Sequence, residues 1–338
     1  MKKIAIIFGG CSTEYEVSLQ SAYAVLTNID RKKYEIISIG ITKEGKWFRY
    51  YGDEKHILDD TWKEMECTPA WILPDRDERG ILECTKIGVR LIKVDVVFPI
   101  LHGKNGEDGT IQGLIEMAGL KIVGCGMLSS AICMDKDKAH RLVEKAGIPV
   151  PKAVVLQRGE KAENLTYPVF VKPVRAGSSF GITKVDREED LDKAIEAAFT
   201  HDDEVIIEEN IKGFEVGCAV LGNKELLVGR VDEIELSDGF FDFTEKYTLQ
   251  SSKIHMPARI DEETEEKICK TAKKIYRTLS CKGFARVDMF LTPDKEIIFN
   301  EVNTIPGFTS HSRYPNMMRG IGMSFEEVLD KLISLEVG

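Results

Sequence analysis

Four polar side chains in the last quarter of the chain have the types and the spacing to bind a divalent cation. Arg286 and Asp288 lie two residues apart in one apolar stretch, and Glu301 and Asn303 lie two residues apart in the next. Alternate residues of a strand share a face, so each pair projects to one side of a sheet. Carboxylate and amide oxygens, without cysteine or histidine, suit Mg²⁺ or Mn²⁺. Because Mg²⁺ usually also binds phosphate oxygens, these residues predict a site for metal and nucleotide.

The two apolar stretches are predicted to form a β-hairpin, because residues 292–295 between them are typical of a turn. Pairing the first and last residues of this turn would place Asp288 opposite Phe299 and Arg286 opposite Glu301. All four polar side chains would then lie on one side of the sheet. The alternative is a solvated face with an ordinary Arg–Glu cross-strand pair. The repeated spacing, followed by a Pro-Gly loop, favours the metal site.

Composition excludes several classes of protein. A chain of 338 residues, 43% hydrophobic and 30% charged, predicts two or three ordinary globular domains. A net charge of −10 argues against nonspecific nucleic-acid binding. Apolar runs are too short for a membrane span, and the run at residues 4–8 is too short for a signal peptide. Eight scattered cysteines without a CxxC pair predict reduced thiols and a cytoplasmic location.

The first part of the chain alternates predicted strands and helices. Buried strands are expected at residues 2–9, 33–41 and 94–101, with helices after the first and the third. Such alternation predicts a small doubly wound domain, in which ligands gather at the carboxyl ends of the strands. Residues 49–88 are polar and interrupted, and we expect them to be peripheral.

Two of these strand ends carry candidate substrate-binding residues. Glu16 follows a pair of glycines and is placed to meet a substrate ammonium, although with Thr13 it also fits a helix capping box. His102 begins a glycine-rich loop that enters a helix, where backbone N–H groups can bind an anion. That loop could equally be an ordinary turn with Asp108 or Thr110 as the helix N-cap.

The middle of the chain supplies candidate nucleotide-binding residues. A strand at residues 167–173 carries Lys172 and leads into a small-residue loop at 175–181, which can bring N–H groups onto phosphates. The loop lacks the GK[ST] ending of a P-loop. A second strand at residues 205–210 carries two glutamates. Together with Lys136 and the metal hairpin, these residues would surround a triphosphate from several sides.

Seven motifs cover nearly the whole chain: GGCSTEYEVS, LHGKNGEDGTIQG, MDKDKA, VFVKPVRAGSSFGI, EKY, GFARVDMF and FNEVNTIPGFTSHSRYP. In this order they resemble the D-alanine–D-alanine ligase family of ATP-grasp enzymes, and within it most closely the VanG-type D-alanine–D-serine ligases. The resemblance implies an α/β fold (α+β in the later domains), an ATP-grasp fold with an N-terminal doubly wound domain. The implied domains are an N-terminal substrate domain at 1–130, a central one at 131–222 and a C-terminal one at 223–338.

The resemblance also implies a role for each candidate residue. Catalytic roles fall on Glu16, Ser178, Tyr247, Arg286 and the backbone of Gly307. ATP would be bound by Lys136, Lys172, Ser179, Phe180, Glu208, Glu209, Ile211, Glu215 and Lys246. Two Mg²⁺ ions, or Mn²⁺, would be held by Asp288, Glu301 and Asn303. The two amino acids would contact His102, Asp232, Phe241, Ser312 and Arg313.

The implied reaction activates the carboxyl group of D-alanine as an acyl phosphate, which the amine of a second amino acid then attacks. This intermediate hydrolyses in water, so residues 237–253 are expected to form a lid, although they could be a long surface loop. Arg313 stands where D-alanine-adding enzymes usually carry Leu or Met, and Tyr247 where the D-lactate-adding branch typically carries His. We therefore expect D-serine as the second substrate, with D-alanine as the alternative.

Two other classes of protein stay open on the sequence. One is another ATP-grasp enzyme, such as a peptide-type ligase or a biotin-dependent carboxylase, which would lack Glu16 and the HSRYP element. The other is a non-catalytic nucleotide-binding sensor, which would be expected to lose metal ligands or Tyr247. No partner protein is implied, and related ligases are commonly homodimers.

Overall fold

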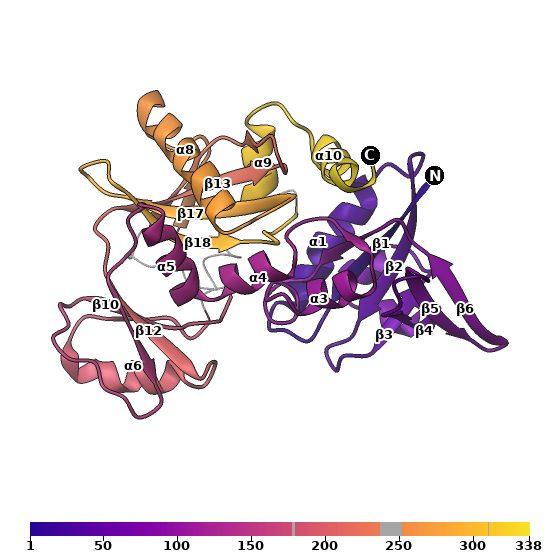
Figure 1. Cartoon of the computed structure of the whole chain (residues 1–338), viewed down its shortest axis with the longest axis horizontal. Coiled ribbons are helices and arrows are strands. Elements are labelled where there is room, and N and C mark those ends of the chain that lie inside the picture. The colour runs from indigo at the N-terminus through magenta and orange to yellow at the C-terminus, as the bar shows by residue number, and fades with distance from the viewer. Residues whose placement is uncertain (178–179, 237–251, 310) are drawn as a thin grey trace.

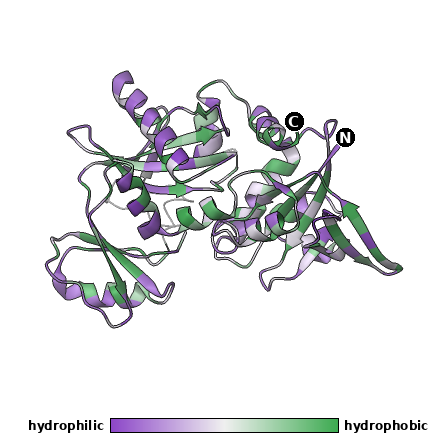
Figure 2. Cartoon of the chain, in the orientation of Figure 1, coloured by the Kyte–Doolittle hydropathy of each residue, from purple (hydrophilic) through white to green (hydrophobic). Residues whose placement is uncertain are grey.

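The computed structural model describes residues 1–177, 180–236, 252–309 and 311–338. Its strands form three sheets that follow one another along the chain (Figure 1). Hydrophobic residues concentrate in the strands, whereas helix α8 (Glu262–Thr278), on the outside of the third sheet, is largely hydrophilic (Figure 2). No helix in the described parts of the chain is long and apolar enough to cross a membrane.

The first sheet contains the three strands predicted from the N-terminal sequence, which confirms them. β1 (Lys2–Gly9) pairs in parallel with β2 (Tyr34–Ile41) and β7 (Val96–Ile100), and β8 (Lys121–Ile122) pairs in parallel with β7 at the edge of the sheet. Helix α1 (Tyr15–Asn28) follows β1. The helices after β7 and β8 are α3 (Thr110–Met117), α4 (Met127–Met134) and α5 (Lys136–Lys145).

Residues 49–88 are not peripheral, which corrects the expectation for this segment. They supply most of four antiparallel strands that extend the sheet beyond β2, and Trp62 between them is fully buried against Phe8. Short edge strands with one half-exposed face produce the interrupted polar pattern. The added elements are β3 (Trp47–Tyr50), α2 (Lys55–Leu58), a 3₁₀ turn (Trp62–Glu64), β4 (Cys67–Ile72), β5 (Gly80–Thr85) and β6 (Gly88–Lys93).

The second and third sheets are antiparallel. β13 (Phe214–Leu221) already belongs to the third sheet, so the passage from one sheet to the next falls at residues 210–213. The predicted domain bounds stay predictions. The second sheet contains β9 (Ala153–Gln157), β10 (Val169–Pro173), β11 (Thr183–Val185) and β12 (Glu204–Glu209), with a 3₁₀ turn (Glu188–Asp190) and α6 (Leu191–Ala198). The third adds β14 (Leu227–Val228), β15 (Asp232–Leu236), β16 (Ser252–His255), β17 (Phe284–Leu291) and β18 (Ile297–Asn303).

The β17–β18 hairpin forms, but its register differs from the predicted one by two residues. The Thr292 N–H donates to the Glu296 carbonyl (3.0 Å), so the turn is one residue longer than expected. A β-bulge between Asp288 and Met289 supplies the second residue of the shift. Asp288 therefore lies opposite Glu301 rather than Phe299. Because the total shift is even, the predicted common face is preserved.

The last two helices, α9 (Arg313–Arg319) and α10 (Phe325–Val337), return the chain to the first domain. α10 lies beside α1, close to the N-terminus (Figure 1). The Tyr34 hydroxyl donates to Asp330 (2.7 Å), and one hydrophobic core runs from β1 through Phe308 to Leu332. The third sheet and the first domain are thereby held together around the loop that follows β18.

Candidate functional site

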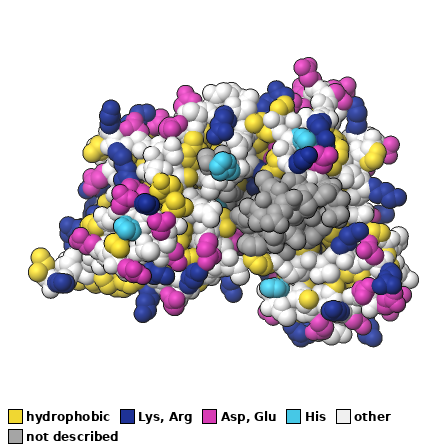
Figure 3. All heavy atoms as spheres, turned by 180° about the vertical axis from the view of Figure 1, so that it is seen from behind, with side chains coloured by type: hydrophobic (Ala, Val, Ile, Leu, Met, Phe, Trp, Pro, Cys, Tyr) yellow, Lys and Arg dark blue, Asp and Glu magenta, His cyan; other side chains and the backbone are white. Residues whose placement is uncertain are grey.

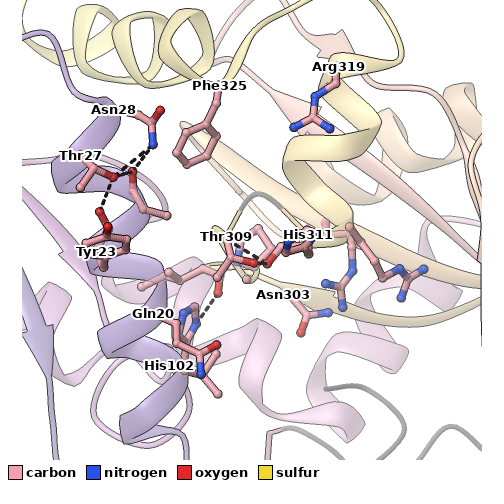
Figure 4. Close-up of a pocket in the computed structure, with 18 of the residues that line it drawn as sticks. Gln20, Tyr23, Thr27, Asn28, His102, Asn303, Thr309, His311, Arg319 and Phe325 are labelled. Carbon is pink, nitrogen blue, oxygen red and sulfur yellow. Dashed lines mark hydrogen bonds between the residues drawn. The ribbon is translucent and has the colours of Figure 1, made fainter. Parts of the chain in front are cut away.

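A cavity of about 960 Å³ lies where the first domain meets the third sheet. Its walls come from α1, the loop that begins at His102, the ends of β17 and β18, residues 305–309 and 311–312, α9 and the start of α10 (Figure 4). Gln20 and His102 lie at one end of the view, and Asn28 and Phe325 at the other (Figure 4). The cavity thus opens along α1 from the polar hairpin outward.

The predicted metal ligands meet on one face of the hairpin. Asp288 is 1% exposed and accepts hydrogen bonds from Arg286 Nε (2.8 Å) and from Asn303 Nδ2 (2.9 Å), while Glu301 pairs with it across the strands. Two carboxylates and an amide suit a hard divalent cation. Among the described residues no group of three or more His, Cys, Asp and Glu side chains is arranged to hold a metal ion, so any metal here would need the Asn303 oxygen and non-protein ligands.

Arg313 lies at the centre of a buried ion cluster. Its Nε and Nη2 donate to Asp232 (both 2.8 Å), its Nη1 donates to Glu215 (2.8 Å), and Nη2 is 3.5 Å from Asp288. Burial opposes the positive charge, but the three carboxylates outweigh it and raise the pKa of Arg313 further above its ordinary value. Arg313 lines the cavity, as Ser312 does. Asp232, predicted to contact the second substrate, instead orients Arg313.

His102 is buried and lines the cavity, but both of its ring nitrogens already have protein partners. Nδ1 lies 2.9 Å from the Ile305 carbonyl oxygen, and Nε2 lies 3.0 Å from Ser21 Oγ. A carbonyl only accepts, so Nδ1 carries the proton and Nε2 accepts from the hydroxyl. Burial lowers the pKa of His102 to about 4, which keeps the ring neutral. His102 therefore joins the first domain to the loop after β18 and is not free to bind a substrate through nitrogen.

Glu16 does not line the cavity, which corrects the prediction for this residue. Its side chain is 60% exposed and pairs with Lys43 at 2.5 Å. The predicted capping box is absent too, because the N-cap is Glu14 and its side chain makes no cap hydrogen bond. Successive residues of a helix turn by about 100°, and Glu14 and Glu16 are two residues apart. Their side chains therefore point in roughly opposite directions.

Glu14 is the carboxylate that the sequence analysis missed. It is 5% exposed and lines the cavity. A Cβ built on Gly103 would lie 2.3 Å from Glu14 Oε2, and one built on Gly177 would lie 2.8 Å from it. Glu14 therefore lies where the first domain meets the small-residue loop of the second sheet. Its neighbour Glu107 was missed as well; burial and the charge of Glu14 raise the pKa of Glu107 to about 8.

The predicted nucleotide-binding residues of the second sheet lie partly together. Lys172 Nζ donates to Glu208 Oε2 (2.5 Å), and Lys136 Nζ donates to the Ala176 carbonyl (2.8 Å) in the small-residue loop. Burial disfavours the Glu208 carboxylate, but Lys172 outweighs burial and lowers its pKa. Glu209 projects to the other face, where it accepts from the Lys152 N–H (2.9 Å).

Two buried acceptors in this region lack a hydrogen-bond partner. Glu208 Oε1 and His140 Nδ1 lie 3.9 Å apart, and neither has a partner among the described residues. His140 Nε2 donates to the Asn300 carbonyl (2.9 Å), so in the neutral ring Nδ1 is an acceptor. Such orphaned acceptors suit a ligand that brings N–H donors, as an adenine amino group does. These two atoms, together with the amino groups of Lys136 and Lys172, fit a nucleotide here.

The remaining predicted residues fall into two groups. Ser312 Oγ accepts from the Thr309 N–H (3.0 Å), and Gly307 lines the cavity beside it. Phe180 follows the small-residue loop and Ile211 follows β12, both half-buried. Ser178, Ser179, Phe241, Lys246, Tyr247 and most of the expected lid at 237–253 lie outside the described residues.

Two family models match most of the chain: the D-ala D-ala ligase N-terminus at residues 3–125 and the D-ala D-ala ligase C-terminus at 142–334. The solved VanG D-Ala:D-Ser ligase from Enterococcus faecalis is 64% identical, with a TM-score of 0.93 and 99% of each chain covered. The vancomycin B-type resistance protein VanB from Enterococcus faecalis is 47% identical over 99% of this chain and 98% of its own. The D-alanine–D-alanine ligase from Bacillus anthracis, solved with ATP, is 28% identical, with a TM-score of 0.74 and coverage of 100% and 98%.

The fold and these matches define an ATP-dependent ligase with the ATP-grasp fold. More narrowly, the chain belongs to the D-alanine–D-alanine ligase family.

Proposed function

We propose that this enzyme joins D-alanine to D-serine with ATP, and that the product enters peptidoglycan precursors that confer vancomycin resistance. The D-alanine carboxylate attacks the γ-phosphorus of ATP, which releases ADP and forms D-alanyl phosphate. The amine of D-serine then attacks the acyl carbon, the C–O bond to phosphate breaks, and the amine loses a proton. The dipeptide and inorganic phosphate are the products.

The nucleotide would lie between the second and third sheets. Lys136 and Lys172 supply positive charge for its phosphates, and Glu208 with His140 offers two acceptors for the base. Asp288, Glu301 and Asn303 would hold Mg²⁺, which neutralises phosphate charge and polarises the transferred phosphoryl group. Phe180 and Ile211 would contact the base, whereas Glu209 is directed toward β9 and is left out of this set.

The first D-alanine would bind with its ammonium at Glu14, which takes the role that the sequence analysis gave to Glu16. Glu14 is nearly buried, so its charge acts at low effective dielectric on a cation in the cavity. Arg286 and the Gly307 N–H line the same cavity and would stabilise the negative charge that develops on the acyl oxygen.

The proposed preference for D-serine as second substrate depends on Arg313. It forms a charged wall of the cavity next to Ser312, and Asp232 holds its guanidinium by two hydrogen bonds. The hydroxyl of D-serine would gain a polar partner at this wall. The methyl group of D-alanine would desolvate the charge without forming a hydrogen bond. The 64% identity to a solved D-Ala:D-Ser ligase supports the same choice. D-alanine as second substrate is the alternative, because the family also contains D-alanine–D-alanine ligases.

A phosphate-release assay with ATP and D-alanine tests the proposal. We expect kcat/KM for D-serine as second substrate to exceed that for D-alanine at neutral pH by about tenfold or more, since a site built to hydrogen-bond a hydroxyl rejects the analogue without it. A protein that binds ATP but releases no phosphate with either amino acid would be a nucleotide sensor. A higher kcat/KM for D-alanine would make it an ordinary D-alanine–D-alanine ligase.

Arg313→Met in the same assay assigns this preference to a residue. We expect the ratio of the two kcat/KM values to shift toward D-alanine, because the polar wall is lost. The substitution also leaves Asp232 and Glu215 without their cation, so a thermal melt must show that the variant is folded. Arg277→Met, at an exposed arginine of α8, is the control and should leave the ratio unchanged. An unchanged ratio in folded Arg313→Met would remove Arg313 from the explanation.

A further inference from the structure

The segment Ile305–Phe308, which follows β18, is held from the first domain by three side chains. A carboxyl oxygen of Glu107 accepts from the Ile305 N–H (3.0 Å), and His102 Nδ1 donates to the Ile305 carbonyl (2.9 Å). On the other side of Gly307, the Phe308 N–H donates to Ser21 Oγ (3.3 Å). We call these three side chains, Glu107, His102 and Ser21, the clasp.

The clasp is continuous within the first domain. The second Glu107 oxygen accepts from the Gly103 N–H (2.9 Å), which is next to His102 in the chain. Ser21 Oγ lies 3.0 Å from His102 Nε2, so the hydroxyl that accepts from Phe308 also donates to the imidazole. All three side chains are at least nine-tenths buried. Each polar group of this network has a partner, and such networks fix a single arrangement.

The anchored groups stand on both sides of Gly307. Pro306 has no N–H, and within the described residues the Gly307 N–H has no hydrogen-bond acceptor, although Gly307 lines the cavity. A free N–H between two anchored residues is a preorganised donor, and such donors act strongly on charge that develops in a transition state. No other backbone N–H of the segment is available in this way, because those of Ile305 and Phe308 are used by the clasp.

We propose that Glu107, acting with Ser21 and His102, is a positioning residue that holds the Gly307 N–H toward the reacting acyl group. This inference rests on the proposed ligase reaction. It assigns no contact with a substrate to the clasp. The first domain would thereby contribute to transition-state stabilisation. The Gly307 N–H belongs to the C-terminal domain, but side chains of the first domain, across the cavity, fix its position.

Glu107→Gln tests the proposal. The amide nitrogen cannot accept, so one of the two N–H groups loses its acceptor, and we expect kcat to fall about 10- to 100-fold, the effect of a small misplacement of a catalytic group. The KM for ATP should stay within about twofold, because the clasp does not touch the second sheet. A phosphinate dipeptide analogue, whose tetrahedral phosphorus carries the oxyanion, should bind more weakly in proportion to the loss of kcat, whereas D-alanine binding should change little.

Asp108→Asn is the matched control. Asp108 is the next residue, and its carboxylate also accepts two backbone N–H groups, from Asn105 (2.8 Å) and Thr110 (3.0 Å), but both belong to its own loop. Even if this variant loses thermal stability, we expect its kcat and its affinity for the analogue to stay near wild type. Should Glu107→Gln fail to fold, Ser21→Ala leaves Glu107 in place and removes the two bonds of the Ser21 hydroxyl, to the Phe308 N–H and to His102 Nε2. It should lower kcat and analogue affinity in the same proportion.

Three results would overturn the proposal: a wild-type kcat in Glu107→Gln, an equal loss of kcat in Asp108→Asn, or an unchanged affinity of Glu107→Gln for the phosphinate analogue. The wild-type enzyme is assayed first, so that an absence of ligase activity counts against the proposed function. Loss of activity without loss of analogue affinity would count only against the clasp.

Discussion

Replacing Asp288 by asparagine is expected to lower kcat by about a thousandfold, the scale of electrostatic stabilisation lost with a metal or an oxyanion contact. Asp288 joins Arg286, Asn303 and the Arg313 cluster, so the neutral amide would change both the proposed metal site and the charge balance around it. The assay is phosphate release at saturating ATP and D-alanine over a wide range of Mg²⁺ concentration. Mn²⁺ binding in the presence of ADP, followed by electron paramagnetic resonance, gives a readout that does not depend on turnover.

The matched control for this substitution is Asp294→Asn, in the exposed turn of the same hairpin. It removes one carboxylate from the turn that joins the same two strands, and it should leave kcat and Mn²⁺ affinity unchanged. Full activity in Asp288→Asn, with a normal thermal melt, would show that this face of the hairpin does not serve the reaction.

Glu14→Gln is expected to lower kcat/KM for the first D-alanine by about a hundredfold. Removing one partner of a buried charge pair typically costs about 2–5 kcal/mol, and the proposed partner here is the substrate ammonium. The loss should appear in kcat/KM for D-alanine and not in the KM for ATP. Initial rates at varied D-alanine, with ATP and D-serine saturating, measure it.

Glu16→Gln is a sharp control, because it changes the same chemical group two residues away. Glu16 is exposed and paired with Lys43, and exposed ion pairs contribute little. We expect its kinetics to stay within twofold of wild type. If Glu16→Gln proved the more damaging of the two, the assignment of the ammonium site to Glu14 would be wrong.

The sequence predicted the common face of the hairpin although its pairing was wrong. The prediction depended on strand alternation, which a register shift of two residues leaves intact. The three parallel strands of the first sheet were predictable for a similar reason, because their apolar runs are continuous and bounded by turns. β12 and β13 read as similar apolar strands in the sequence, and their assignment to different sheets could not be predicted because pairing partners are not a local property.

Residues whose role depends on one position of a helix or on distant contacts escaped prediction. Glu14 and Glu16 differ by two positions, and only the start of α1 at Tyr15 decides which of them faces the cavity. Ser21 and Phe308 are 287 residues apart, and Glu107 and Ile305 are 198 residues apart. Nothing in the local pattern around Glu107 distinguishes it from Asp108, which caps its own loop.

The arrangement of charge agrees with a small-molecule enzyme. On the face shown in Figure 3, basic and acidic side chains are interspersed and form no basic stripe. Lys172 and Arg313 are instead buried, Arg286 is largely buried, and all three are paired with carboxylates. These pairs keep the cations in place for the charges that ATP and the amino acids would bring.

The most direct test of the account is the product formed from ATP, D-alanine and D-serine when both amino acids are present at equal concentration and neutral pH. Mass spectrometry separates the two dipeptides, because D-serine adds one oxygen atom. The proposed function predicts an excess of D-alanyl-D-serine over D-alanyl-D-alanine. A product that is mainly D-alanyl-D-alanine would contradict it.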